Sequence, residues 1–316
     1  MDLSIVTTLY CSEATVREFY RRAVEVSERH SQAFEIIFVN DGSPDNSLDI
    51  VQEIQKKDPR VVVVDLSRNF GHHKAIMTGL SIARGERIFL IDSDLEEEPE
   101  WLTMFFQHLN DKCDVVYGVQ ETRRGSFMDQ IAGHLFYSLL KYVMGGDFPR
   151  NFVTARLMTR RYVESLLRFK EQEIFLGGLW YLTGYRQVAL PVKKHQLSPT
   201  TYSLTKKLAL FVNAVTSFSN RPLILIFYTG VVIFALGMAG ALIIIIQQLF
   251  FNVSLVGWPS LMVSIWTIGG LSILFNGIIG IYVSKIFSET KGRPYTIVKD
   301  VFGRTLEHRD SDERSS

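Results

Sequence analysis

The chain has 316 residues, of which 47% are hydrophobic, and its formal net charge is +1. This length suits one large domain with an additional segment, and the composition excludes disordered and collagen-like classes. The near-neutral charge gives no reason to expect a nucleic-acid partner. Cys11 and Cys113 lack the spacing of a zinc site or a disulfide framework, so both are expected to be ordinary buried thiols.

The first part of the chain predicts an α/β fold. Short apolar strands alternate with helical segments, which is typical of βαβ units and a mostly parallel sheet. The expected strands are LSIVTTLY (3–10), FEIIFVN (34–40), VVVVDLS (61–67), RIFLID (87–92) and DVVYGV (114–119), and the expected helices are 13–29, 47–57 and 73–84. Ligands of such sheets bind at the carboxyl ends of the strands, where Asp41, Asp65, Asp92 and Asp94 are found.

The acidic run that follows the fourth strand is the first candidate site. Asp92 and Asp94 stand two residues apart where the strand alternation ends, so both carboxylates can converge on one cation. Mg²⁺ or Mn²⁺ takes such oxygen ligands and completes its shell with phosphate oxygens. An Asp-x-Asp pattern alone is weak evidence and depends on the motifs around it. The glutamates that follow are expected to form a solvated first helical turn without a chemical role: Glu96, Glu97, Glu98 and Glu100.

Two segments in the middle of the chain carry an apolar stripe at helical spacing, residues 127–144 and 206–219. Such a stripe is typical of a helix that lies in the membrane interface, but also of a helix that packs against the sheet. Both interpretations remain open at the level of sequence.

The last third of the chain predicts two membrane-spanning helices. Leu223–Ile246 and Trp258–Val283 contain no charged residue and exceed the roughly 20 residues that cross a bilayer. The connecting loop 247–257 has no Lys or Arg, whereas basic residues flank both helices, so both termini are expected in the cytosol. No signal peptide is apparent. The expected location is the inner (plasma) membrane, with a cytosolic domain at 1–221, a helical hairpin at 222–284 and a cytosolic tail at 285–316. Glycines in both helices are compatible with a homo-oligomer.

Four motifs occur in a characteristic order: IVTTLY (5–10), VNDGSPDNS (39–47), RNFGHHKAIMTGLSIARG (68–85) and IDSDLEEEPE (91–100). Together they resemble the family 2 glycosyltransferases of the GT-A fold. They are most similar to the polyprenyl-phosphate glycosyltransferases, which include dolichol-phosphate mannose synthases and bacterial enzymes that load a sugar onto undecaprenyl phosphate. The resemblance covers nearly the whole chain, since the bacterial group also carries two C-terminal membrane helices.

The resemblance implies a role for each matching residue. Asp92 and Asp94 would hold a metal-bound diphosphate, and Arg123 and Arg156 would contact phosphates as catalytic residues. The residues expected around the donor nucleotide-sugar are Thr8, Tyr10, Glu13, Asp41, Lys74 and Ser93. His72 and His73 are expected at a helix N-terminus near the donor phosphates rather than at a metal.

The chain departs from the pattern at one important place. Relatives usually carry a third acidic residue just before the Arg156 region, and here Asn151 or Thr154 stands there, depending on the alignment. A carboxylate general base is therefore in doubt. A phosphomonoester acceptor needs no such base, because it is already largely ionised at pH 7.

The expected activity is the inverting transfer of one sugar from a nucleotide-sugar to a polyprenyl phosphate at the cytosolic membrane face, aided by Mg²⁺ or Mn²⁺. A processive polysaccharide synthase is one alternative, and a membrane scaffold that binds a sugar nucleotide without turnover is another. A Rossmann dehydrogenase is disfavoured because no GxGxxG opens the first helix. The sequence specifies neither the sugar nor the nucleotide.

Overall fold

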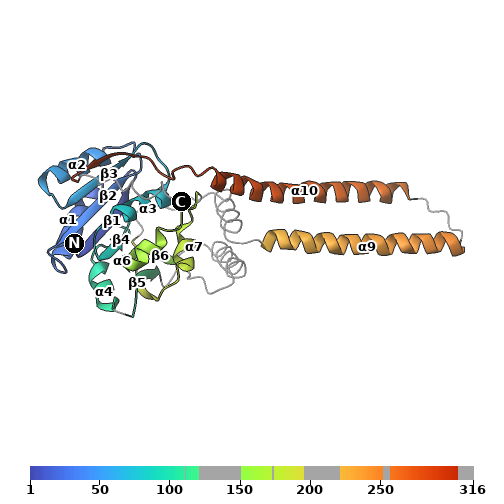
Figure 1. Cartoon of the computed structure of the whole chain (residues 1–316), viewed down its shortest axis with the longest axis horizontal. Helices are drawn as coiled ribbons and strands as arrows, with labels where there is room; N and C mark the ends of the chain where they lie inside the picture. Colours follow the sequence, from blue (N-terminus) through green and yellow to red (C-terminus); the bar gives the residue numbers. More distant parts are fainter. Residues whose placement is uncertain (111, 121–150, 173, 196–220, 252–256, 305–316) are drawn as a thin grey trace, which may run out of the picture. The chain divides into compact units, whose positions relative to one another are not determined.

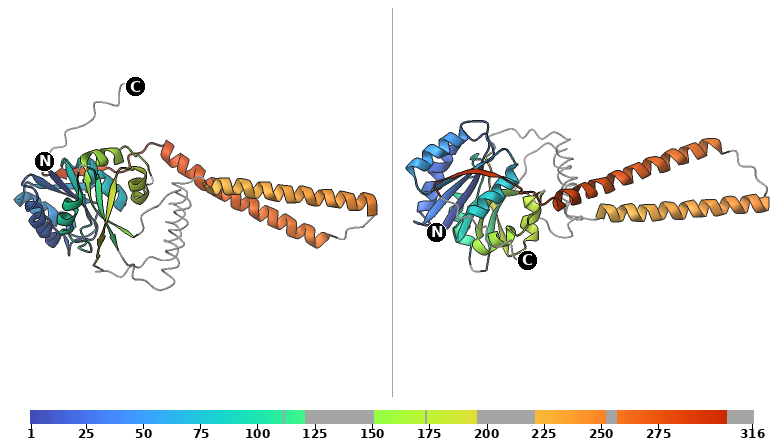
Figure 2. Two further views of the ribbon diagram at one scale, coloured as in Figure 1. Left: turned by 90° about the horizontal axis from the view of Figure 1, so that it is seen from below. Right: turned by 45° about the horizontal axis from the view of Figure 1, so that its top comes forward.

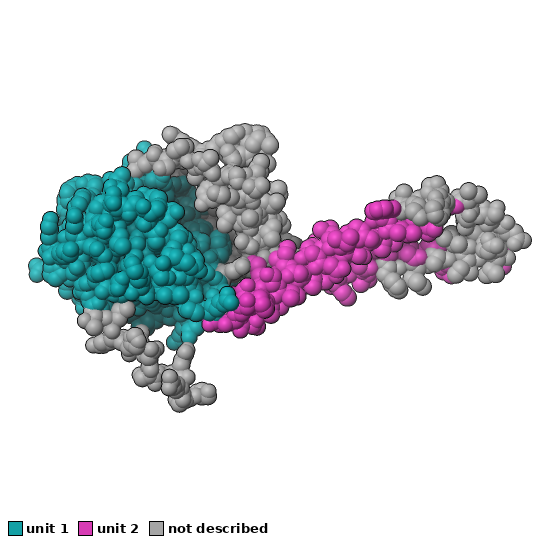
Figure 3. Space-filling model, turned by 90° about the horizontal axis from the view of Figure 1, so that it is seen from above, with its two compact units in different colours: residues 1–137, 147–202, 293–316 teal, residues 138–146, 203–292 magenta. Residues whose placement is uncertain are grey.

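The computed structural model describes residues 1–110, 112–120, 151–172, 174–195, 221–251 and 257–304. The chain forms two compact units, one of residues 1–137, 147–202 and 293–316, the other of residues 138–146 and 203–292 (Figure 3). The expected helices at 127–144 and 206–219, together with Arg123, lie outside the described residues.

An eight-stranded sheet is the centre of the first unit, with the strand order β7-β5-β6-β4-β1-β2-β3-β8 (Figure 1). Its strands are β1 (Leu3–Leu9), β2 (Phe34–Asn40), β3 (Val61–Leu66), β4 (Arg87–Leu90), β5 (Val115–Gln120), β6 (Phe152–Thr159), β7 (Gln187–Val192) and β8 (Val298–Phe302). Strands β1 to β4 pair in parallel with one another, and β5 pairs in parallel with β7. Strand β6 runs antiparallel to β4 and β5, and β8 runs antiparallel to β3. The prediction of a mostly parallel α/β sheet is confirmed, and it fits a GT-A-like fold.

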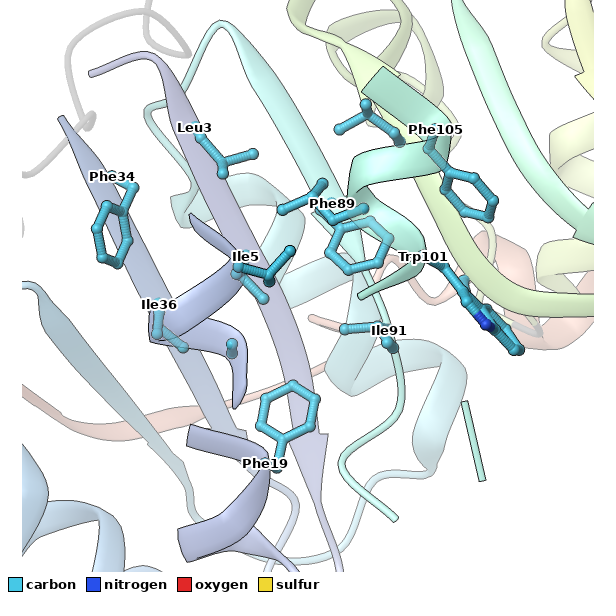
Figure 4. Close-up of a cluster of buried hydrophobic side chains, with 14 of the residues drawn as sticks. Leu3, Ile5, Phe19, Phe34, Ile36, Phe89, Ile91, Trp101 and Phe105 are labelled. Carbon is cyan, nitrogen blue, oxygen red and sulfur yellow. The ribbon is translucent and has the colours of Figure 1, made fainter. Parts of the chain in front are cut away.

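Burial explains why the first strands are so apolar. Every residue of β1, β2 and β3 is buried, because helices cover both faces of the sheet. Helices α1 (Val16–Glu28), α2 (Ser47–Lys57) and α4 (Trp101–His108) share one hydrophobic cluster with one set of alternating strand residues (Figure 4). Helix α3 (His72–Ile82) packs on β1 and β2 through the other face.

Helix α3 can approach the sheet because residue 79 is glycine. A Cβ at Gly79 would come within 2.5 Å of the Val6 side chain and 2.9 Å of the Val39 side chain. Any larger residue would push α3 away from the strands. The close approach therefore helps to bring the start of α3 to the ends of β1 and β2, where the candidate site lies.

The second part of the sheet was not predicted. The expected strands end at residue 119, whereas β6 and β7 follow it in the chain and both pair with β5. Helix α6 (Arg160–Leu166) packs on β4 and β6, and helix α7 (Leu176–Leu182) precedes β7.

The segment after the last long helix returns to the sheet as β8, the red strand in Figure 2. Lys299 Nζ lies 3.2 Å from Asp65 Oδ2, and Arg304 Nη1 lies 3.1 Å from Glu35 Oε2. The second of these ion pairs is largely buried. Residues 298–304 are thus an integral part of the first unit and not a free tail.

The second unit contains two long helices, α9 (Arg221–Phe251) and α10 (Trp258–Thr290). Within α10, Ser264–Thr290 is long and apolar enough to cross a membrane by length and composition. Helix α9 contributes a shorter apolar stretch, Leu223–Gly237. One of the two expected spans is therefore a candidate in the described residues, and the second stays a prediction.

Candidate active site

The acidic pair lies in a turn between β4 and α4, at the carboxyl end of the central strand β4. Asp94 Oδ1 accepts a hydrogen bond of 2.9 Å from the amide of Glu96, and Asp92 Oδ1 lies 3.4 Å from His72 Nε2. Leu95, which follows Asp94, has a φ of 61°, a left-handed backbone that a bulky residue rarely adopts. Desolvation, followed by the charge of Asp92, raises the pKa of Asp94 above its ordinary value. The two carboxylates thus lie close enough to interact electrostatically.

Ser93 has a supporting role in this turn. Its hydroxyl donates a hydrogen bond of 2.8 Å to the Thr8 carbonyl, and its Oγ is also within hydrogen-bond distance of Ser12 Oγ, at 3.1 Å. The side chain is buried, and both bonds connect the acidic turn to the end of β1. In this structure Ser93 therefore orients its neighbours.

A small pocket lies at the ends of β1 and β2. It has a volume of about 110 Å³ and is lined by Thr8, Tyr10, Asp41, Asn69 and His72. Asp41 follows β2 directly, and its two carboxylate oxygens accept hydrogen bonds from the amides of Phe70, 2.7 Å, and Gly71, 3.0 Å. Burial raises the pKa of Asp41, and these two amides oppose the shift.

Gly42 allows the two loops around this pocket to touch. Its φ is +60°, and a Cβ there would come within 2.5 Å of the Asn69 amide nitrogen. A side chain at this position would be strained and would also separate the loops that Asp41 joins. The local sequence Asp41-Gly42 is therefore matched to the pocket geometry.

Three of the expected donor residues line this pocket, namely Thr8, Tyr10 and Asp41. Glu13 instead holds the loop before α2, where its carboxylate accepts a hydrogen bond of 3.0 Å from the Asn46 side chain. Lys74 lies in the first turn of α3 and is not part of the pocket lining, whereas His72 is.

His72 lines the pocket, and the placement of Lys74 near the donor stays a prediction. Helix α3 begins at His72, as expected for the start of a helix near the donor, and His72 Nδ1 lies 3.0 Å from Thr8 Oγ1. The motif GHHK indicates a helix start near the donor. It does not show which of the two adjacent histidines is the first helical residue, and so which one lines the pocket.

The glutamates after the acidic pair differ from their expectation. Helix α4 begins at Trp101, so Glu96, Glu97 and Glu98 belong to the turn. Glu97 has no exposed side-chain surface and contacts β6, so the prediction that it is solvated is wrong. Cys11 also differs from the sequence analysis, because its thiol is exposed while that of Cys113 is buried.

A second and larger pocket surrounds Arg156 in the middle of β6. Its volume is about 510 Å³, and the residues around Arg156 are Tyr117, Phe152, Gly177, Trp180, Tyr181, Leu182, Gly184, Tyr185 and Gln187. Arg156 is 1% exposed, and its guanidinium lies over the Trp180 ring. It donates hydrogen bonds to the carbonyls of Thr154, 3.1 Å, and Val153, 3.2 Å.

The charge of Arg156 is poorly compensated. Among the described residues no carboxylate forms an ion pair with it, and burial lowers its pKa to about 9. A buried cation without a counter-ion is costly, so an anionic group that enters this pocket would be stabilised. Asn151 has a φ of 56° at the turn that enters β6, while the Thr154 amide donates to Glu97.

The donor set at the acidic pair suits a divalent metal. The described residues contain no group of three or more His, Cys, Asp and Glu side chains that could hold a metal ion. Mg²⁺ and Mn²⁺, however, are commonly held by one or two carboxylates together with substrate phosphates. Asp92 and Asp94 provide two such oxygen ligands in a partly open turn.

Comparison with known proteins identifies the family. The model of the family described as glycosyl transferase family 2 matches residues 4–167. The chain belongs to this family. A protein of Mycobacterium tuberculosis (strain CDC 1551 / Oshkosh), named as a glycosyltransferase, is 46% identical over 98% of this chain and 91% of its own length.

Two other relatives also match this glycosyltransferase along almost its full length. An uncharacterized glycosyltransferase of Bacillus subtilis (strain 168) is 36% identical over 96% of this chain and 95% of the relative. A prophage bactoprenol glucosyl transferase homolog of Escherichia coli (strain K12) is 30% identical over 95% of this chain and 99% of the relative.

Proposed function

We propose that this glycosyltransferase moves a single sugar from a nucleotide-sugar to a polyprenyl phosphate, with inversion at the anomeric carbon. The observation that carries the proposal is the end-to-end similarity to bactoprenol glucosyl transferases, at about 30% identity over 95% of this chain. That similarity includes the two long helices as well as the sheet. We therefore place the reaction at the cytosolic face of the inner membrane, with domain limits at residues 221 and 284.

On the donor side, the pocket of Thr8, Tyr10, Asp41, Asn69 and His72 is our candidate site for the nucleoside. The hydroxyl, carboxylate, amide and imidazole groups of these residues can form hydrogen bonds to a base and a ribose. Asp92 and Asp94 would hold Mg²⁺ or Mn²⁺, which supplies charge neutralisation for the departing nucleoside diphosphate. His72 would contribute by holding Asp92 and Thr8 in a common arrangement.

On the acceptor side, the pocket of Arg156 is our candidate site for the lipid phosphate. A guanidinium fork matches phosphate oxygens, and the aromatic walls around it suit an apolar neighbour such as a prenyl chain. Arg123, outside the described residues, stays a predicted second phosphate contact.

The reaction needs no general base if the acceptor is a phosphate. The oxygen of an ionised phosphomonoester is itself the nucleophile, so it attacks the anomeric carbon as the bond to the nucleoside diphosphate breaks. A neutral Thr154 beside Arg156 is compatible with this chemistry, whereas a sugar hydroxyl acceptor would need a carboxylate to remove its proton.

The test is a donor screen with the purified full-length protein, undecaprenyl phosphate in detergent and a panel of radiolabelled nucleotide-sugars. The proposal expects one glycosylated lipid that carries a single sugar. A polymer would instead indicate a processive synthase, and binding of a nucleotide-sugar without any product would indicate a scaffold. Either of these outcomes would contradict the proposal.

A further inference from the structure

The acidic turn is held from the side by two residues that follow β7, Lys194 and His195. Lys194 Nζ lies 3.1 Å from Glu96 Oε2, and the amide of His195 donates a hydrogen bond of 2.8 Å to the Glu96 carbonyl. His195 Nε2 also lies 2.5 Å from Glu98 Oε1. Three contacts thus connect the end of β7 to the turn that carries Asp92 and Asp94.

Glu97 connects the same turn to β6. Its two carboxylate oxygens accept hydrogen bonds from the amides of Thr154, 3.0 Å, and Ala155, 2.8 Å. Lys194 Nζ lies 3.6 Å from Glu97 Oε1, and it is the only cation that pairs with Glu97 in the described part of the chain. The ammonium group of Lys194 therefore pairs with both Glu96 and Glu97, and the side chain of Glu97 is fully buried.

Lys194 is one positive charge among several acidic side chains. Asp92, Asp94, Glu96 and Glu97 all face it from the turn, and their attraction raises the pKa of Lys194 although burial alone would lower it. Burial and the charge of Asp92 in turn raise the pKa of Glu97 above its ordinary value. The ammonium is thus a fixed positive charge within the field of Asp92 and Asp94, the two carboxylates that would hold a metal.

We propose that Lys194 is a positioning residue for the acidic pair, which pins the turn to the end of β7 and weakens the affinity of Asp92 and Asp94 for a divalent cation. The inference rests on the proposed function, because it assigns the metal to these two carboxylates. A positive charge beside a cation site repels the incoming metal, and the repulsion is felt most where solvent is partly excluded.

The two parts of this role predict effects of opposite sign. Loss of the pinning contacts makes the turn less ordered and lowers thermal stability, since Glu97 then lacks its cation. Loss of the charge makes the pair of aspartates more attractive to a metal. A residue with a purely structural role would lower both stability and metal affinity when it is replaced.

The experiment measures Mn²⁺ binding to the full-length protein without nucleotide or lipid, from the free Mn²⁺ signal in electron paramagnetic resonance. We expect Lys194→Met to bind Mn²⁺ about threefold to tenfold more tightly than the wild type, while its melting temperature falls. Lys194→Arg keeps the charge and should retain the wild-type dissociation constant. Lys194→Gln is a polar alternative in case the methionine variant folds poorly.

The neighbouring Lys193 provides a matched control. Its side chain is exposed and forms no contact with the acidic turn among those that the structure describes, so Lys193→Met should leave Mn²⁺ binding unchanged. Weaker Mn²⁺ binding by Lys194→Met, an unchanged constant, or no Mn²⁺ binding by the wild type would each overturn the inference.

This experiment is separate from the lipid assay. The Mn²⁺ titration contains no acceptor, so failure to glycosylate undecaprenyl phosphate would refute the proposed function without changing the titration. Conversely, an unchanged titration would remove the role of Lys194 while the glycosylated lipid could still form.

Discussion

The two halves of the sheet differ in how a buried charged side chain is compensated. In the parallel half, formed by β1 to β4, Asp41 has amide partners for both of its carboxylate oxygens, and each residue that lines the small pocket beside it carries a hydrogen-bonding group. In the mixed half, formed by β5 to β7, Arg156 is buried among aromatic rings and has no anionic partner among the described residues. The pockets also differ in volume, about 110 Å³ against about 510 Å³.

This difference indicates how the two halves divide the reaction. A polar group that is already satisfied by the backbone is pre-organised and changes little when a ligand binds. A buried cation without a counter-ion gains the most when the ligand itself brings the negative charge. The parallel half thus suits recognition of a neutral nucleoside, and the mixed half suits capture of an anion.

The largest effect is expected at the junction of the two halves, in the acidic turn. Asp92→Asn removes one of two carboxylates that would neutralise the diphosphate with a metal, so kcat should fall by at least about 100-fold. Steady-state rates with the donor found in the screen will measure this. Asp49→Asn, an exposed substitution on α2, is the control, and an Asp92→Asn enzyme with half of the wild-type rate would disprove the assignment.

An intermediate effect is expected from Arg156→Met, which removes the cation from the aromatic pocket. We expect the KM for the lipid phosphate to rise by about tenfold or more, with the KM for the donor changed less than about twofold.

Arg156→Lys keeps the charge without the planar guanidinium. Its KM for the lipid phosphate should lie between those of the wild type and Arg156→Met. Arg168→Met changes an exposed arginine outside the pocket and should behave as the wild type. If the donor KM rises instead of the acceptor KM, the division between the two halves is wrong.

The smallest effect is expected at Asp45, in the loop between β2 and α2. Burial alone would raise the pKa of Asp45, but hydrogen bonds from Ser43, Ser47 and the Glu13 amide lower it to about 2. A carboxyl with a lowered pKa stabilises the fold above its ordinary pKa, and this contribution is lost as the pH falls toward the lowered value. Asp45→Asn should therefore melt a few degrees below the wild type near neutral pH, and the gap should narrow as the pH falls below 4.

Melting curves of both proteins across this pH range test the prediction. Asp49→Asn is again the control, because Asp49 is exposed and accepts no hydrogen bond among those the structure describes. A gap that stays constant with pH would show that the carboxylate of Asp45 is not the group responsible.

The sequence predicted the parallel half well and the mixed half poorly, for physical reasons. Strands buried on both faces are continuous apolar runs, such as Val61–Val64, and βαβ order makes them parallel. Strand β6 contains Arg156 and two threonines, so it has no such run, and its antiparallel pairing cannot be inferred from chain order.

The candidate site shows the same limit. Asp41 and the acidic pair could be located from the strand ends, because ligands gather there. Glu97 and Lys194 could not, because their meeting depends on the turn before α4 and on β7, which are about a hundred residues apart. The run of three glutamates at 96–98 also carries no pattern that distinguishes the fully buried one from its partly buried neighbours.

Strand β8 has a consequence for the order in which the molecule is completed. The ribosome makes α9 and α10 before Val298–Phe302, so the sheet lacks its outer strand, and Glu35 its partner Arg304, until both long helices have emerged. In the chain, α9 and α10 lie between β7 and β8, which belong to one sheet. The chain therefore leads into the sheet on both sides of the two helices. Synthesis that stops inside α10 would thus leave an unpaired edge at β3, open to association with other chains.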